Sequence, residues 1–206
     1  MMLKKQNEIN EKAMGETWTN LKLDWNTAIL VEAGELIDSL DWKWWKRQES
    51  NWHNAQVEAI DILHFALSIF IESNPTKDEI TKLESDIQEN FQLYASEKDI
   101  VCNCKELTVA TLTNTAPSEI IIKAIKLCAS LGLTLEQTAN LYIGKNILNK
   151  FRQDNGYKDG TYIKQWTKDE DNNYMHMFSI NHKYNENFEK NLWEHLSKTY
   201  ASVVAS

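Results

Sequence analysis

Glycine and proline are scarce in this chain, and their scarcity restricts the possible folds more than any other feature. The chain has 2 Pro and 6 Gly among 206 residues, whereas average usage would give roughly 10 Pro and 14 Gly. These two residues supply the backbone conformations that tight turns need. We therefore expect long helices with few tight connections, and the composition favours an all-α fold.

Apolar residues recur at helical spacing along most of the chain. The predicted helices cover about 3–13, 23–46, 52–72, 77–95, 117–131, 135–153 and 184–198. Thr76 and Glu79 form the sequence pattern of a capping box, which predicts a helix start beside Pro75. Residues 96–116 show no clear pattern, and the polar, aromatic stretch 154–183 is predicted to be a long ordered loop. We expect one helical-bundle domain over residues 1–206, with a smaller variable helical subdomain at about 75–135.

Several classes of protein do not fit this composition. The chain has no apolar run long enough to span a membrane, and its first residues do not resemble a signal peptide. Three cysteines (Cys102, Cys104 and Cys128) are too few for a disulfide framework. The net charge of −8 lacks the basic footprint of a nonspecific nucleic-acid binder. We therefore expect a cytoplasmic protein with no membrane or nucleic-acid partner.

Two helices carry acidic pairs at a spacing of three residues, Glu32 with Glu35 and Glu58 with Asp61. Residues at this spacing share one helix face. If the two helices pack antiparallel, four carboxylates meet, repel one another and raise one another's pKa values. A hard divalent cation such as Mg²⁺ or Mn²⁺ would remove that cost, and Mg²⁺ also favours phosphate ligands. The spacing alone also fits a solvated helix face, but these are the two most apolar helices, where acids are costly.

The basic side chains are concentrated in one segment. Residues 145–168 have a net charge of +4, so the remainder of the chain has −12. Lys145, Asn149 and Arg152 fall on one face of the predicted helix and could bind a polyphosphate. A solvated helix face is the other interpretation of this segment.

Aromatic residues are concentrated at Trp42, Trp44 and Trp45. Three tryptophans this close on a helix cannot all face one core, so at least one is expected to line a pocket or an interface. Stacking of a base on an aromatic ring contributes about 1–3 kcal/mol in nucleic-acid complexes. Core packing or an oligomer contact is the alternative. His64 follows Asp61 on the same face, as a core hydrogen-bonding residue or as a ligand contact.

Four motifs together resemble the dimeric all-α dUTPases, a branch of the all-α NTP pyrophosphatase superfamily that also includes MazG-type hydrolases. They are Glu-x-x-Glu from Glu32, Trp-Lys-Trp-Trp from Trp42, Glu-x-x-Asp-Ile-x-His-Phe from Glu58, and Lys-Asn-x-Leu-Asn-x-Phe-Arg-Gln-Asp-x-Gly-Tyr-Lys from Lys145. The resemblance covers about residues 6–72 and 140–175. The acid pairs fit any member of the superfamily, whereas the second and fourth motifs are specific to the dimeric dUTPases.

This resemblance implies Mg²⁺-dependent hydrolysis of dUTP, and commonly dUDP, to dUMP by a homodimer, with Mn²⁺ as a possible substitute. It implies that the metal ligands and catalytic residues are Glu32, Glu35, Glu58 and Asp61, with Glu35 also orienting or deprotonating the attacking water. The implied nucleotide contacts are Asn10, Trp44, His64, Asn146 and Asn149, with Gln6 and Asn7 as further candidates. The implied phosphate contacts are Lys145, Arg152, Tyr157, Lys158 and Lys164.

Three other functions remain open at this level. A related pyrophosphatase could act on dCTP or on a noncanonical or modified nucleotide, because carboxylates and metal contact only the phosphates. A helical nucleotide sensor could retain the site without catalysis, although all four acids are present. A DNA-binding helical protein could use residues 145–168, although the rest of the chain is acidic.

Overall fold

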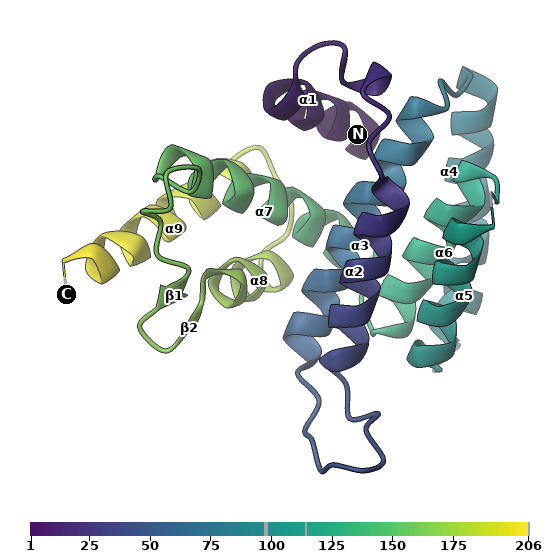
Figure 1. The fold of residues 1–206 in the computed structure, drawn as a ribbon. Helices are drawn as coiled ribbons and strands as arrows, with labels where there is room; N and C mark the ends of the chain where they lie inside the picture. The colour runs from purple at the N-terminus through teal and green to yellow at the C-terminus, as the bar shows by residue number, and fades with distance from the viewer. Residues whose placement is uncertain (97–98, 114, 206) are drawn as a thin grey trace. The chain divides into compact units, whose positions relative to one another are not determined.

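The computed structural model describes residues 1–96, 99–113 and 115–205 and confirms the all-α class. Figure 1 shows helices along nearly the whole described chain, with one short two-stranded hairpin. The chain divides into two compact units, residues 1–135 and 136–206. The predicted single domain over residues 1–206 stays a prediction.

The first unit is built around α3 (Trp52–Glu72), whose range agrees with the predicted helix. It packs against α1 (Met2–Met14), α2 (Trp25–Asp38) and α6 (Pro117–Ser130), and α6 also contacts α4 (Lys77–Ser96) and α5 (Ile100–Leu112). A short 3₁₀ helix, η1 (Trp18–Asn20), follows α1. Figure 1 shows α2 and α3 lying alongside each other.

Capping side chains stabilise the first turn of several helices in this unit. Asp24 accepts a hydrogen bond from the Thr27 amide at 3.0 Å, Asn51 from the Asn54 amide, and Asp99 from the Cys102 amide. The predicted capping box is confirmed, since the Thr76 amide donates to Glu79 at 2.7 Å and the Glu79 amide donates to the Thr76 hydroxyl. Such caps satisfy amides that the first helical turn leaves unpaired.

The prediction that the second helix continues to about residue 46 is wrong. Helix α2 ends at Asp38, and the residues between α2 and α3, 39–51, form a connection that we call the tryptophan loop. The Gln48 side chain donates hydrogen bonds to the carbonyls of Asp38 and Leu40. These bonds satisfy carbonyls that would otherwise require a further helical turn, so α2 can end without a glycine.

Helix α5 occupies the segment in which the sequence shows no clear pattern. It begins after the Asp99 cap, and its buried residues include Asn103 and Thr111 beside Cys104 and Leu107. Because polar and apolar residues share the buried face of α5, the sequence shows no clear helical spacing of apolar residues. Burial raises the pKa of Cys104 to about 11 and of Cys128 to about 12, so both thiols stay protonated and serve as small core side chains.

By length and composition alone, α3 could cross a membrane, but 67% of its apolar window is buried within the structure. Such burial is also typical of a central core helix.

The second unit contains α7 (Leu135–Asp154), β1 (Gln165–Trp166), β2 (Asp169–Glu170), α8 (Asp171–Asn181) and α9 (Phe188–Val204). The strands pair antiparallel, with Gln165 opposite Glu170. Aromatic rings pack around Phe151, whose centroid lies 5.2 Å from that of Trp193 and 5.5 Å from that of Tyr200. Helix α9 starts and ends later than the predicted 184–198.

The predicted loop over 154–183 is wrong for the residues that form α8. The helix has little apolar periodicity, because its buried residues include Asp171, His176 and Ser179. It packs closely on α7 at Gly144, where an added Cβ would lie 2.3 Å from the Ser179 hydroxyl. The short contact shows why a residue without a side chain occupies this position of α7.

We expect the Glu79 cap to make stability depend on pH. The amide and hydroxyl of Thr76 lower the Glu79 pKa from its ordinary value of 4.5. A lowered folded-state pKa contributes stability above the unfolded-state pKa, and this stability is lost as pH falls through the folded-state pKa. Glu79→Gln should therefore lower the melting temperature at pH 7, and the difference should vanish in acid. Thermal melts across pH, with the exposed Glu84→Gln on the same helix as control, would test this; a constant difference would contradict it.

Candidate active site

Three carboxylates of the first unit come together where α2 packs on α3. Glu32, Glu58 and Asp61 each place a carboxylate oxygen within 4.8 Å of the others, and we call them the acid cluster. Glu58 is only 6% exposed, and the other two are half-buried. The donor set consists of oxygen atoms alone, which suits a hard divalent cation such as Mg²⁺ or Mn²⁺. The predicted pairing of α2 and α3 acids is thus present for three of the four residues.

Glu35 lies one turn beyond Glu32 on α2, but its carboxylate is outside the acid cluster. It is exposed and lines a pocket of about 360 Å³ where α2 meets the tryptophan loop. The other lining residues are all polar: Asp38, Ser39, Gln48, Glu49, Asn51 and Asn54. The Asn54 side-chain amide donates to the Ser39 hydroxyl at 2.8 Å, and the Asn51 backbone amide donates to the Ser39 backbone carbonyl. These bonds hold the two ends of the loop beside Glu35.

The tryptophan loop exposes its aromatic rings. Trp44 is 90% exposed, and its ring centroid lies 5.4 Å from that of Trp45, which in turn lies 5.2 Å from that of Trp42. Both contacts are edge-to-face, an arrangement that aromatic pairs favour. Lys43 forms an ion pair with Asp38 at the end of α2. The rings contact one another and leave Trp44 accessible for a contact with a ligand or another chain.

Side chains of α1 and α3 form a buried hydrogen-bonded network that we call the polar quartet: Gln6, Asn10, His64 and Ser68. The side-chain oxygen of Gln6, Oε1, lies 2.7 Å from Nδ1 of His64. Both amide groups donate to the Ser68 hydroxyl, Gln6 at 3.1 Å and Asn10 at 2.9 Å. Asn7 instead accepts from the Trp18 indole and donates to Glu11. The structure therefore brings His64 together with two of the N-terminal candidates.

In the second unit, the residues predicted to contact the nucleotide and its phosphates differ in their surroundings. Lys145 is buried and donates to the Asn172 side chain at 3.2 Å, and Asn146 is also buried. Asn149 is half-buried, whereas Tyr157, Lys158 and Lys164 are exposed. The Lys164 ammonium lies 5.5 Å from the centre of the Tyr157 ring, within reach of a cation–π contact. Gly156, at φ +91°, directs the chain from α7 into this segment.

Arg152 is held by a carboxylate that the sequence analysis did not single out. Its Nε and Nη2 atoms each donate to Asp171 at 2.7 Å, and Nη2 also donates to Asn172 at 3.2 Å. The Tyr162 hydroxyl donates to Asp171 at 2.8 Å. Burial first, and then the Asp171 charge, raise the pKa of Tyr162, so its hydroxyl keeps the proton that it donates. Asp171 is 0% exposed, and its charge is balanced by the bidentate guanidinium.

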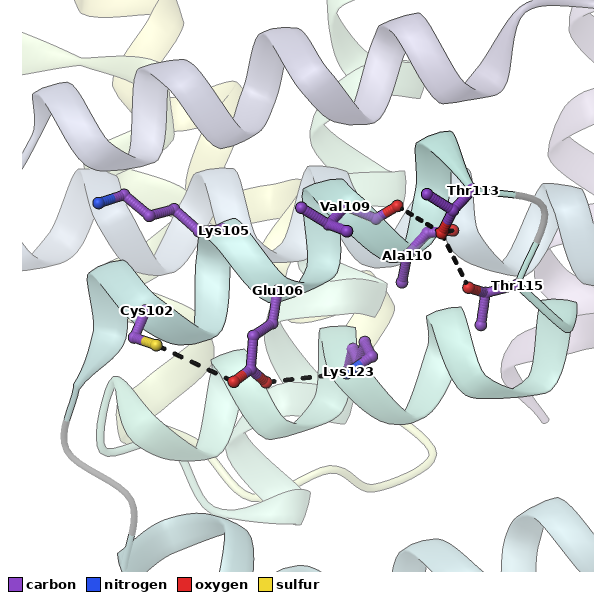
Figure 2. Close-up of a pocket in the computed structure, with 8 residues that line it drawn as sticks. All are labelled: Cys102, Lys105, Glu106, Val109, Ala110, Thr113, Thr115 and Lys123. Carbon is purple, nitrogen blue, oxygen red and sulfur yellow. Dashed lines mark hydrogen bonds and ion pairs between the residues drawn. The ribbon is translucent and has the colours of Figure 1, made fainter.

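A separate pocket of about 420 Å³ lies along α5 and is also lined by Thr113, Thr115 and Lys123 of α6. Figure 2 shows Glu106 reaching Cys102 on one side and Lys123 on the other. None of the predicted site residues lines this pocket.

A family model described as dUTPase matches residues 1–157, about three quarters of the chain. The chain belongs to the all-α dUTPase family. A search of curated proteins found no match. The segment that matches the family model includes the acid cluster, the polar quartet and α7. Lys158, Lys164 and Asp171 lie beyond this segment. Family membership makes the chain a dUTP diphosphatase and its substrate a nucleotide.

The residues that the sequence analysis missed are Ser68 and Asp171. Ser68 lies among apolar residues of α3 and has the pattern of a core serine. Asp171 follows two other acids in a polar stretch, so its sequence context suggests exposure. A long-range partner makes each residue important, and local spacing does not reveal such a partner.

We expect Asp171→Asn to destabilise the fold. Removing one partner of a buried ion pair leaves an uncompensated charge, which typically costs about 3–5 kcal/mol. Denaturant unfolding would measure the loss, with Asp169→Asn as the matched control, because Asp169 is exposed two residues earlier. The control should remain within about 0.5 kcal/mol of the wild type. Equal stability of the Asp171 variant and the wild type would show that the ion pair contributes nothing.

Proposed function

We propose that this dUTPase hydrolyses dUTP and dUDP to dUMP, releasing pyrophosphate or phosphate, with Mg²⁺ held by the acid cluster. The observation that carries the proposal is the meeting of Glu32, Glu58 and Asp61 within 4.8 Å in the segment that matches the family. Mn²⁺ has similar ligand preferences and is proposed as a substitute.

The residues of the acid cluster fit such a cation, because each of them offers a carboxylate oxygen. When bound, the metal would polarise a phosphate and lower the pKa of bound water. Glu35 is proposed as a further ligand and as the residue that orients or deprotonates the attacking water. Its position supports this role, because it is exposed and lies one helical turn from Glu32. A rotamer change of this long side chain would redirect its carboxylate without moving α2.

For the nucleoside, we propose contacts from Asn10 and His64 of the polar quartet and stacking on Trp44. The quartet supports this proposal because it groups amide and imidazole atoms, which can read the edge of a base. The 90% exposure of Trp44 supports a stacking or interface role. Asn146 and Asn149 of α7 are proposed as further nucleotide contacts.

The proposed phosphate ligands are Lys145, Arg152, Tyr157, Lys158 and Lys164 of the second unit. The positive charges of the four basic side chains support this role because phosphates are anionic, and the Tyr157 hydroxyl can donate a hydrogen bond to a phosphate oxygen. Asn172 and Asp171 orient Lys145 and Arg152, which reduces the entropy lost on binding. A homodimer and a cytoplasmic location are also proposed, the first from the family resemblance and the exposed tryptophans.

A nucleotide panel tests the proposed reaction directly. With Mg²⁺, dUTP and dUDP should both give dUMP, with much slower turnover of dCTP and dTTP. Chelation of the metal should abolish turnover, and either Mg²⁺ or Mn²⁺ should restore it. Comparable turnover of dUTP and dCTP would contradict the proposed specificity, and unchanged turnover after chelation would contradict the metal dependence.

Neutral substitutions in the acid cluster and at Glu35 test the catalytic roles of these acids. Asp61→Asn, Glu58→Gln and Glu35→Gln should each lower turnover of dUTP by at least about 100-fold, as expected when a group that stabilises transition-state charge is lost. The control is Glu84→Gln, an exposed acid of α4 in the same unit, which should retain full turnover. Circular dichroism would establish that each variant is folded. Wild-type turnover in any of the three site variants would refute the role of that residue.

A further inference from the structure

The hydrogen bonds of the polar quartet set the direction of the protons that its members share with one another. Ser68 lies at the centre, fully buried on α3. Its hydroxyl donates to the carbonyl of His64, one turn earlier, at 3.0 Å. A hydroxyl has one proton and two acceptor lone pairs. Having donated its proton to a carbonyl, which can only accept, the Ser68 oxygen acts solely as an acceptor toward the other members of the quartet.

This constraint fixes the orientation of two amides. The Gln6 and Asn10 side chains both approach the Ser68 oxygen, at 3.1 and 2.9 Å, so both must present N–H groups to it. The second N–H of Gln6 donates to the Asn10 side-chain oxygen at 3.0 Å. With both amides reversed, two amide oxygens would face the Ser68 oxygen, and its single proton could satisfy only one of them.

The Gln6 orientation in turn sets the tautomer of His64. The Gln6 side-chain oxygen faces Nδ1 of His64 at 2.7 Å and can only accept, so Nδ1 carries the proton. In a neutral imidazole with a proton on Nδ1, the other ring nitrogen is an acceptor. Nε2 of neutral His64 is therefore a hydrogen-bond acceptor.

An acceptor at this position separates two pyrimidines by their chemistry. Uracil has an N–H donor at N3, whereas cytosine has an acceptor lone pair there. We propose that Ser68 is a positioning residue that makes the enzyme select uracil over cytosine, by fixing the His64 tautomer whose Nε2 accepts from the base N3–H. This inference rests on the proposed function, in which His64 contacts the base.

Ser68→Ala removes the atom that distinguishes the two directions of the network. Without the Ser68 oxygen, reversing the Gln6 and Asn10 amides no longer leaves an amide oxygen facing an oxygen that cannot donate to it. The reversed Gln6 presents an N–H group to Nδ1 of His64, so the tautomer with the proton on Nε2 becomes populated. Sites that leave polar groups unpaired against the wrong substrate discriminate by up to about 10⁴–10⁵. The ratio of kcat/KM for dUTP to that for dCTP should therefore fall by at least about 10-fold in the variant.

The matched control is Ser130→Ala. Ser130 is also buried in the first unit, and its hydroxyl donates to the Leu127 carbonyl at 2.8 Å, but it lies on α6 and outside the quartet. This variant should keep the wild-type ratio. A purely structural role for Ser68 would lower turnover of dUTP and dCTP equally, and this result would overturn the proposal.

The tautomer can be observed without a substrate. Nitrogen-15 NMR of the His64 ring, at a pH well above the ordinary histidine pKa of about 6.5, should show the proton on Nδ1 in the wild type and a mixture in Ser68→Ala. A wild type with its proton on Nε2, or a variant with an unchanged tautomer, would overturn the proposal. If the wild type strongly prefers dUTP and Ser68→Ala keeps that preference, this inference alone fails. If the wild type turns over dUTP and dCTP equally, the proposed specificity fails as well.

Discussion

Buried carboxylates cost free energy unless positive charge compensates them, and each unit contains one among the residues that the structure describes. Asp171 is compensated within the chain, by a bidentate contact with Arg152 and a hydrogen bond from Tyr162. Glu58 lies instead in a cluster with two other carboxylates. A divalent cation places two positive charges at one point, which suits three clustered acids better than a single basic side chain does. The two buried acids therefore fit different roles, one structural and the other metal-binding.

Helix α3 links the acid cluster to the polar quartet. Glu58 and Asp61 lie toward its start, and His64 and Ser68 follow on the next turns. A helix rises about 1.5 Å per residue, so the seven residues from Asp61 to Ser68 advance about 10 Å along one rigid element. The ionised carboxylates offer acceptor oxygens and negative charge only, whereas the quartet offers directional donors and acceptors. Chemistry and base recognition can thus be separated on one helix while their spacing stays fixed.

Local sequence signals predict the bounds of a helix well where residues within or beside that helix determine them. The range of α3 follows from its apolar residues, and the start of α4 follows from the Thr76–Glu79 box. The end of α2 is different, because the side chain of Gln48, ten residues later, satisfies the carbonyl of Asp38, the last residue of this helix. Helix α8 depends similarly on Gly144 of α7 and on the ion pair of Asp171. Contacts between distant residues set both boundaries, so periodicity within a short window could not predict them.

In the candidate site, too, some features follow from local residue spacing and others depend on contacts with distant residues. Acid spacing places Glu32, Glu58 and Asp61 together because a helix and its neighbour determine that geometry, whereas the rotamer of exposed Glu35 is not encoded by spacing. Ser68 shows a deeper limit, because the same serine in an apolar helix serves as packing at Ser130. Only the approach of Gln6 and Asn10 from α1 turns its oxygen into a shared acceptor. A hydroxyl proton with one available carbonyl can then determine which ring nitrogen of His64 accepts, a consequence that no property of Ser68 alone implies.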